Sequence, residues 1–130
     1  MATTLTTISF VVRDYDEAIA WFIKTLGFTL IDDVAQGEGK RWVVVAPPHG
    51  QGAKLLLAKA ANSEQQMAIG HAAGGRVAFF LHTDDFEEDH ARMLAAGVRF
   101  RETPRSEPYG KVAVFEDLYG NGWDLIGPAR

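Results

Sequence analysis

Three pairs of punctuating residues recur at one fixed spacing, and this repeat constrains the fold more than any other feature of the chain. The pairs are two candidate helix N-caps, two glycines placed to end helices and two loop glycines, each 70 residues apart: Asp14 and Asp84, Gly27 and Gly97, Gly52 and Gly122. The side chains between them match only in type, as in FVVRDYDEA against FLHTDDFEE. A constant period of this length indicates a duplicated module.

Each copy has the pattern of one strand, one helix and three further strands. The first copy is predicted to contain strands at 8–12, 28–31, 42–45 and 54–58, with a helix after Asp14. The second is predicted to contain strands at 77–81, 98–100, 112–115 and 123–126, with a helix after Asp84. The sequence therefore predicts an α+β fold of two tandem βαβββ modules. Pseudo-two-fold symmetry would curl their mixed sheet around a shared cavity.

The 130 residues suffice for a single domain with one core. Module one is expected at about 5–59, a linker at 60–75 and module two at about 76–127. Within the linker, Ser63 with Gln66 resembles a capping box, which predicts a short helix through Met67.

Composition excludes several classes of function. The chain has no cysteine, so it has neither disulfides nor thiolate chemistry. Its formal charge of −4 and the lack of a basic run argue against nucleic acid as a partner. No stretch reaches the ~20 apolar residues of a membrane span, and the N-terminus lacks the features of a signal peptide. A cytoplasmic protein that acts on or binds a small molecule is expected.

Asp124 is a carboxylate inside the apolar run WDLI. Because burying a charge costs free energy, we expect this side chain to point to water, to pair with a base or to belong to a functional site. Lys54 occupies the equivalent position of the first module, and the two side chains are predicted to pair across the cavity. The alternatives are a backbone-bonded acid and a lysine that extends to solvent. Trp42 and Trp123 are the aromatics expected to line the cavity and bind the ligand.

The segment 101–111 is long for a connection between strands and is either a lid or a polar surface hairpin. In it, Arg105 would bind an anionic group, Glu107 would accept a proton or ligate an ion, and Tyr109 would stack on a ring or take part in catalysis. His82 ends its strand just before a helix cap, where an imidazole either bonds the cap or acts as a general base. Strand alternation places it on the opposite face from Val77, which favours the structural role.

Three stretches, VVRDYDEAIAWFIKTLGF, VAFFLHTDDF and VFEDLYGNGWDLI, resemble the vicinal oxygen chelate superfamily. This superfamily includes glyoxalase I, extradiol dioxygenases, fosfomycin-resistance proteins and bleomycin-resistance proteins. The resemblance covers nearly the whole chain and implies a glyoxalase-like fold, commonly as a homodimer. It also implies a divalent metal, such as Zn, Ni, Mn or Fe, held by side chains from the first and last strands of the modules.

The chain departs from that metal-binding pattern. The four positions that the resemblance assigns to metal ligands hold Thr7, Lys54, Val77 and Asp124. Only Asp124 is an ordinary ligand, and a lysine cation would repel a divalent ion. No cofactor is therefore expected.

Three functions stay open. The first is a glyoxalase-like protein that acts on or binds a small molecule with most ligand positions lost. The second is a metal-dependent lyase or dioxygenase, of the lactoylglutathione lyase type, with an unusual ligand set. The third is a non-catalytic resistance protein that sequesters its ligand. The sequence does not decide whether the protein is an enzyme.

Overall fold

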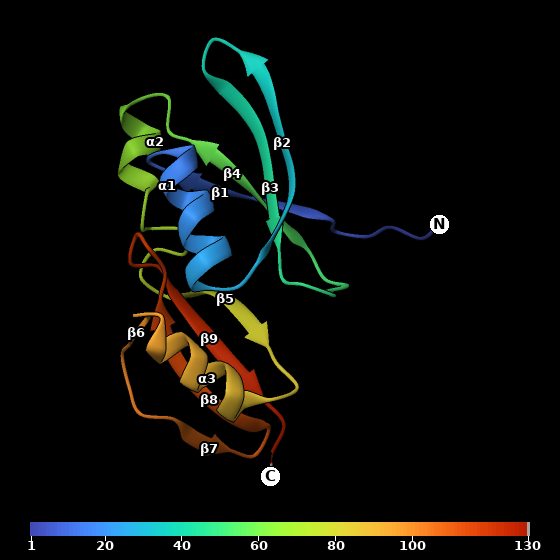
Figure 1. Cartoon of the computed structure of the whole chain (residues 1–130), viewed down its shortest axis with the longest axis vertical. Helices are drawn as coiled ribbons and strands as arrows, with labels where there is room; N and C mark the ends of the chain where they lie inside the picture. The colour runs from blue at the N-terminus through green and yellow to red at the C-terminus, as the bar shows by residue number, and fades with distance from the viewer. Residues whose placement is uncertain (130) are drawn as a thin grey trace. The chain divides into compact units, whose positions relative to one another are not determined.

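The computed structural model describes residues 1–129, and the chain divides into two compact units. The first unit runs from Met1 to Ile69 and the second begins at Gly70. Each unit contains one mixed sheet with a helix against one face (Figure 1). The predicted α+β class and the repeated βαβββ order are confirmed. No helix within residues 1–129 is long and apolar enough to cross a membrane.

The first unit has a four-stranded sheet in the order β1-β4-β3-β2. Strand β1 pairs with β4 in parallel, and the other neighbours are antiparallel. Its elements are β1 (Thr7–Val12), α1 (Tyr15–Ala20), η1 (Trp21–Thr25), β2 (Thr29–Gly37), β3 (Lys40–Ala46), β4 (Lys54–Lys59) and α2 (Ser63–Ala68).

The second unit repeats this plan with one added strand. Its elements are β5 (Val77–His82), α3 (Phe86–Ala95), β6 (Arg99–Phe100), β7 (Arg105–Glu107), β8 (Gly110–Glu116) and β9 (Gly122–Gly127). The sheet order is β5-β9-β8-β6, and β7 also pairs with β8. As in the first unit, the first and last strands pair in parallel.

Helix α1 begins and ends at the predicted punctuation. The Asp14 carboxylate accepts a hydrogen bond from the backbone N–H of Glu17 at 2.8 Å, which caps the first turn. The helix continues as the π-helical turn η1, and Gly27 after it has φ +82°, the conformation that favours glycine. Phe22, 1 % exposed, packs edge-on against Phe10 of β1 with ring centroids 5.3 Å apart. This face of the first sheet is the core.

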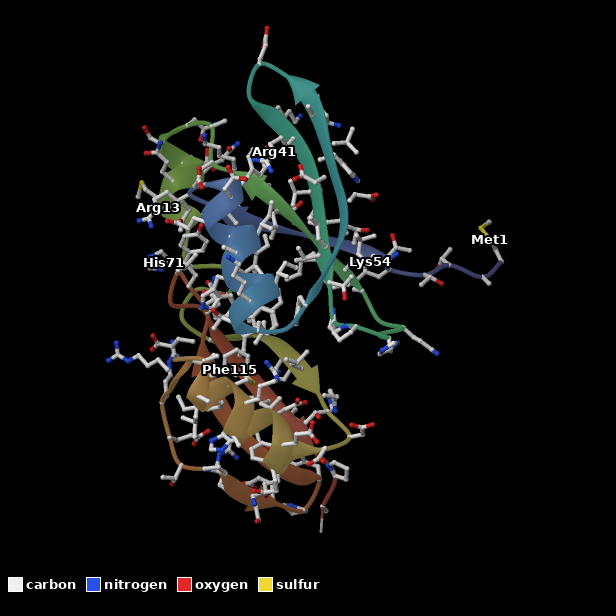
Figure 2. All side chains as sticks on the ribbon, in the orientation of Figure 1. Met1, Arg13, Arg41, Lys54, His71 and Phe115 are labelled. Atoms are coloured by element: carbon white, nitrogen blue, oxygen red, sulfur yellow. The ribbon has the colours of Figure 1, made fainter. Side chains whose placement is uncertain are left out.

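Helix α3 covers one face of the second sheet. Its Met93 is fully buried, as is Phe115 of β8, the residue labelled in Figure 2. Trp123 of β9 is 3 % exposed and packs between Phe79 and Phe115, with ring centroids 4.6 and 5.6 Å away. The aromatic side chains of three adjacent strands thus pack together on this face of the sheet.

The predicted caps of the other two helices are each wrong by one residue. The N-cap of α3 is Asp85, whose carboxylate accepts from the Glu88 N–H at 3.1 Å, and Asp84 is exposed. The shift arises because the Thr83 hydroxyl accepts from the Asp85 N–H at 3.0 Å, adding a turn before the helix. Helix α2 is capped by Asn62, whose side chain accepts from the backbone of a residue in the first turn. The repeat of 70 residues therefore holds for the helix-ending glycines but not for the caps.

The long segment 101–111 is the predicted hairpin rather than an irregular lid. Strand β7 pairs with β8 through three residue pairs, with Arg105 opposite Val112 and Glu107 opposite Gly110. The polar side chains of this segment are thus fixed on a strand.

Candidate functional site

A β-bulge in β5 determines which side chains share a face of the second sheet. Val77 pairs with Gly122, and Phe80 pairs with Asp124, but the register shifts by one residue in between. Because partners on neighbouring strands lie on the same face, Val77, Phe80 and His82 all share the face of Asp124. The prediction that His82 faces away from Val77 is wrong, because the bulge adds one residue and interrupts the alternation of side chains between the two faces of the sheet.

Asp124 lies on the face of β9 that is turned away from α3. Its neighbours Trp123 and Leu125 are buried on the helix side, at 3 % and 1 % exposed. Asp124 itself is half-buried, and its Oδ1 atom is buried without a hydrogen-bond partner among residues 1–129. Burial raises the pKa of this carboxyl, Arg105 opposes the rise, and Glu102 adds to it.

The β7–β8 hairpin gathers polar groups near Asp124. The Arg105 guanidinium donates to Glu107 Oε1 at 2.8 Å and to Glu102 Oε1 at 3.2 Å. Glu102 is fixed in turn because its other oxygen accepts from the Val114 N–H of β8 at 2.8 Å. Hydrogen bonds to Glu107, then to Tyr109, raise the pKa of Arg105.

Four residues predicted from the sequence therefore lie close together in the second unit. They are Arg105, Glu107, Tyr109 and Asp124. Arg105 connects them, because it interacts with Glu107, Tyr109 and Asp124, and their roles in binding or catalysis stay predictions.

Arg101 is a residue that the sequence reasoning missed. Its guanidinium donates to Glu116 Oε2 at 2.9 Å and to the carbonyl oxygen of Gly120 at 3.1 Å. A Cβ on Gly122 would lie only 2.8 Å from Arg101 Nη1. The guanidinium can therefore pack against the backbone here because glycine has no side chain. Gly122 shares the face of Asp124, two residues away. The Gly-Asn-Gly turn was the signal that a side chain from elsewhere approaches the backbone here.

Asp117 holds the turn between β8 and β9 and thereby orients β9. The Asp117 carboxylate is 6 % exposed and accepts from the Tyr119 N–H, the Asn121 N–H, the Asn121 side-chain amide and Trp123 Nε1, at 2.8–3.1 Å. Because the indole is fixed on the helix side, alternation places Asp124 on the other face. Trp123, predicted to line the cavity, thus lies in the core of its unit.

Lys54 and Trp42 belong to the first unit. Lys54 begins β4 opposite Thr7 of β1, and its side chain is exposed (Figure 2). Trp42 is 41 % exposed and pairs with Val34 of β2. Register places Lys54 and Trp42 on the face of the first sheet away from α1.

The donor groups do not fit a metal centre. No group of three or more histidine, cysteine, aspartate or glutamate side chains within residues 1–129 is arranged to hold a metal ion. Asp124 has the Arg105 cation near it, which disfavours a divalent ion at the same carboxylate.

Comparison with known proteins shows the family. The sequence model of the Glyoxalase/Bleomycin resistance protein/Dioxygenase superfamily matches residues 4–125. The chain belongs to this superfamily. An uncharacterized protein of Shewanella frigidimarina (strain NCIMB 400) is 53 % identical over 127 residues, covering 97 % of this chain and 94 % of that protein.

Two solved structures with the superfamily's fold are similar to this chain over almost their whole length. The crystal structure of UcmS2 has 29 % identity and a TM-score of 0.83, covering 97 % of this chain and 98 % of that chain. TnmS3, an antibiotic binding protein from Streptomyces sp. CB03234, has 27 % identity and a TM-score of 0.74, covering 99 % and 98 %. The expected glyoxalase-like fold is confirmed.

Replacing Asp124 by asparagine is expected to stabilise the protein increasingly as the pH rises. The pKa of Asp124 lies above its ordinary value of 3.8 in the folded state, so its stabilising contribution is fully present below that value. It is lost as the pH rises through the folded-state pKa. Urea denaturation of Asp124→Asn and the wild type at several pH values from about 3 to 7 measures the difference. A difference in unfolding free energy that does not change with pH would contradict the assignment.

Proposed function

We propose that this protein binds a small organic molecule, releases it chemically unchanged and needs no metal to do so. The observation that carries the proposal is the buried Oδ1 of Asp124, an acceptor for which residues 1–129 supply no hydrogen-bond partner, beside the exposed ring of Phe80. A buried acceptor costs free energy unless a donor satisfies it, and a ligand would supply that donor. The likeness to TnmS3, an antibiotic binding protein, favours an antibiotic-like ligand.

The donor groups of the site support binding more than turnover. The carboxylates near Asp124 are committed to Arg105 and Arg101 through hydrogen bonds of 2.8–3.2 Å. A general base or metal ligand would need a carboxylate that is free to take a proton or an ion. Within residues 1–129, Asp124 Oδ1 is the buried side-chain oxygen without a hydrogen-bond partner, which suits recognition of a donor.

A ligand panel tests this proposal. Purified protein is titrated calorimetrically with aromatic polyketide, peptide and glycopeptide antibiotics, in EDTA and again with zinc, nickel, manganese or iron(II). We expect at least one compound to bind with a Kd below about 100 μM, equally well in EDTA, and to be recovered intact by mass spectrometry. Conversion of a bound compound to a product, or binding that requires a metal, would refute the proposal. Binding of none of the compounds would refute it as well.

A further inference from the structure

The exposed ring of Phe80 is the most unusual feature of the second sheet. Phe80 is 62 % exposed, whereas its neighbour Phe79 is half-buried and packs on the core residue Trp123. A single exposed apolar side chain is common and by itself means little. Phe80, however, stands directly opposite Asp124 on the adjacent strand.

The first unit shows that this position needs no aromatic ring. Strands β1 and β4 pair over six consecutive residues without a shift, and Lys54, which occupies the position equivalent to Asp124, pairs with the exposed polar residue Thr7. In the first unit, a polar residue therefore occupies the outward position that Phe80 occupies in the second unit. In β5 the bulge turns Phe79 inward and Phe80 outward. Bulges that re-aim a side chain are frequent next to functional sites.

The charges around this pair favour a cation. Among residues 1–129, four carboxylates lie on or beside this face and outnumber the three guanidinium groups there by one: Glu102, Glu107, Glu116 and Asp124 against Arg99, Arg101 and Arg105. The guanidinium groups of Arg101 and Arg105 are held by glutamates, and Asp124 Oδ1 is the buried side-chain acceptor without a protein partner within residues 1–129.

The distance between Phe80 and Asp124 and the chemistry of their side chains define the ligand that would fit there. Adjacent strands lie about 5 Å apart, so one molecule spans from the face of the Phe80 ring to the Asp124 carboxylate. A flat ring would stack on Phe80, a positive charge would be attracted to its π-face, and an N–H would donate to Oδ1.

We infer that Phe80 and Asp124 form one subsite, which selects a planar aromatic ligand that carries a protonated nitrogen. This inference rests on the proposed binding function and specifies the ligand class. Phe80 determines the preference for flatness, and Asp124 determines the preference for positive charge.

Three probes separate these two preferences. They are 9-aminoacridine, which is flat and cationic at pH 7, acridine-9-carboxylate, which is flat and anionic, and cyclohexylmethylamine, which is cationic but not flat. Titration of the full chain is expected to show 9-aminoacridine binding at least about tenfold more tightly than the other two.

Variants assign the preferences to residues. Phe80→Ala should weaken 9-aminoacridine binding about tenfold, and Phe80→Tyr, which keeps a flat ring, should retain it. Asp124→Asn should weaken 9-aminoacridine about tenfold and reduce its advantage over the carboxylate probe. Leu94→Ala, which alters an exposed side chain on α3, is the matched control and should bind like the wild type. Near-ultraviolet circular dichroism confirms that each variant is folded.

The outcomes distinguish the subsite from the wider function. Equal binding of the three probes, no binding of 9-aminoacridine, or unchanged affinity in Phe80→Ala and Asp124→Asn would overturn the subsite. If antibiotics of the panel still bind in that case, the proposed function stands. If nothing in the panel binds, the proposed function fails, and the subsite fails with it.

Discussion

Asp117→Ala is expected to lower the free energy of unfolding by at least about 3 kcal/mol. The Asp117 carboxylate accepts hydrogen bonds from two backbone N–H groups, an amide side chain and the Trp123 indole, and it is 6 % exposed. Hydrogen bonds to a charged group each contribute about 1.5–3 kcal/mol, and each buried donor left without a partner costs about 1–3 kcal/mol. Urea denaturation followed by Trp fluorescence and far-ultraviolet circular dichroism measures the change.

Two further variants control this result. Asp117→Asn keeps one acceptor oxygen but replaces the other by an NH₂ donor, so an intermediate loss is expected. Asp32→Ala removes an exposed acid on β2 and should change the stability by less than about 0.5 kcal/mol. A loss below about 1 kcal/mol in Asp117→Ala would show that water satisfies these donors and that the turn does not depend on this carboxylate.

Local chemistry explains why the sequence predicts most of the fold. Gly27 and Gly97 have φ of +82° and +89°, values that side chains rarely adopt, so these glycines mark the helix ends in the sequence itself. Asp14 likewise caps α1 through a bond within its own turn. The strand positions follow from short apolar runs between such signals.

Pairing between strands is where sequence reasoning fails. Phe79 and Phe80 are both apolar, so the pattern does not show which of them faces the core. The choice is made by packing of Phe79 on Trp123 and by the bulge, which involve residues more than 40 positions apart. The orientation of His82 is wrong for the same reason.

The candidate site is predictable in part. Arg105, Glu107 and Tyr109 are near one another in sequence, and one hairpin keeps them together. Phe80 and Arg101 escape prediction because each reaches the face of Asp124 through contacts between strands. Neighbours within one hairpin can be grouped from the sequence, whereas contacts made by pairing between strands cannot.

Gly110→Ala is expected to destabilise the second unit by about 3–5 kcal/mol. Gly110 begins β8 with φ +149°, and a Cβ there would lie 2.1 Å from the carbonyl oxygen of Gly127. The obstacle is backbone in the strand paired with β8, so relief requires the strands to separate. Gly110 also pairs with Glu107, so the hairpin that carries Arg105 should lose its geometry.

Gly39→Ala separates conformational strain from the clash. Gly39 also has a positive φ, +79°, but nothing lies within 4 Å of the Cβ position. Its replacement should therefore cost only the strain of the left-handed conformation, about 1–2 kcal/mol. Urea denaturation of both variants measures the difference, and 9-aminoacridine titration shows whether the face of Asp124 is disturbed. Equal losses in the two variants would mean that the strands adjust to the added carbon, and that the approach of β8 to β9 does not set the geometry of the hairpin.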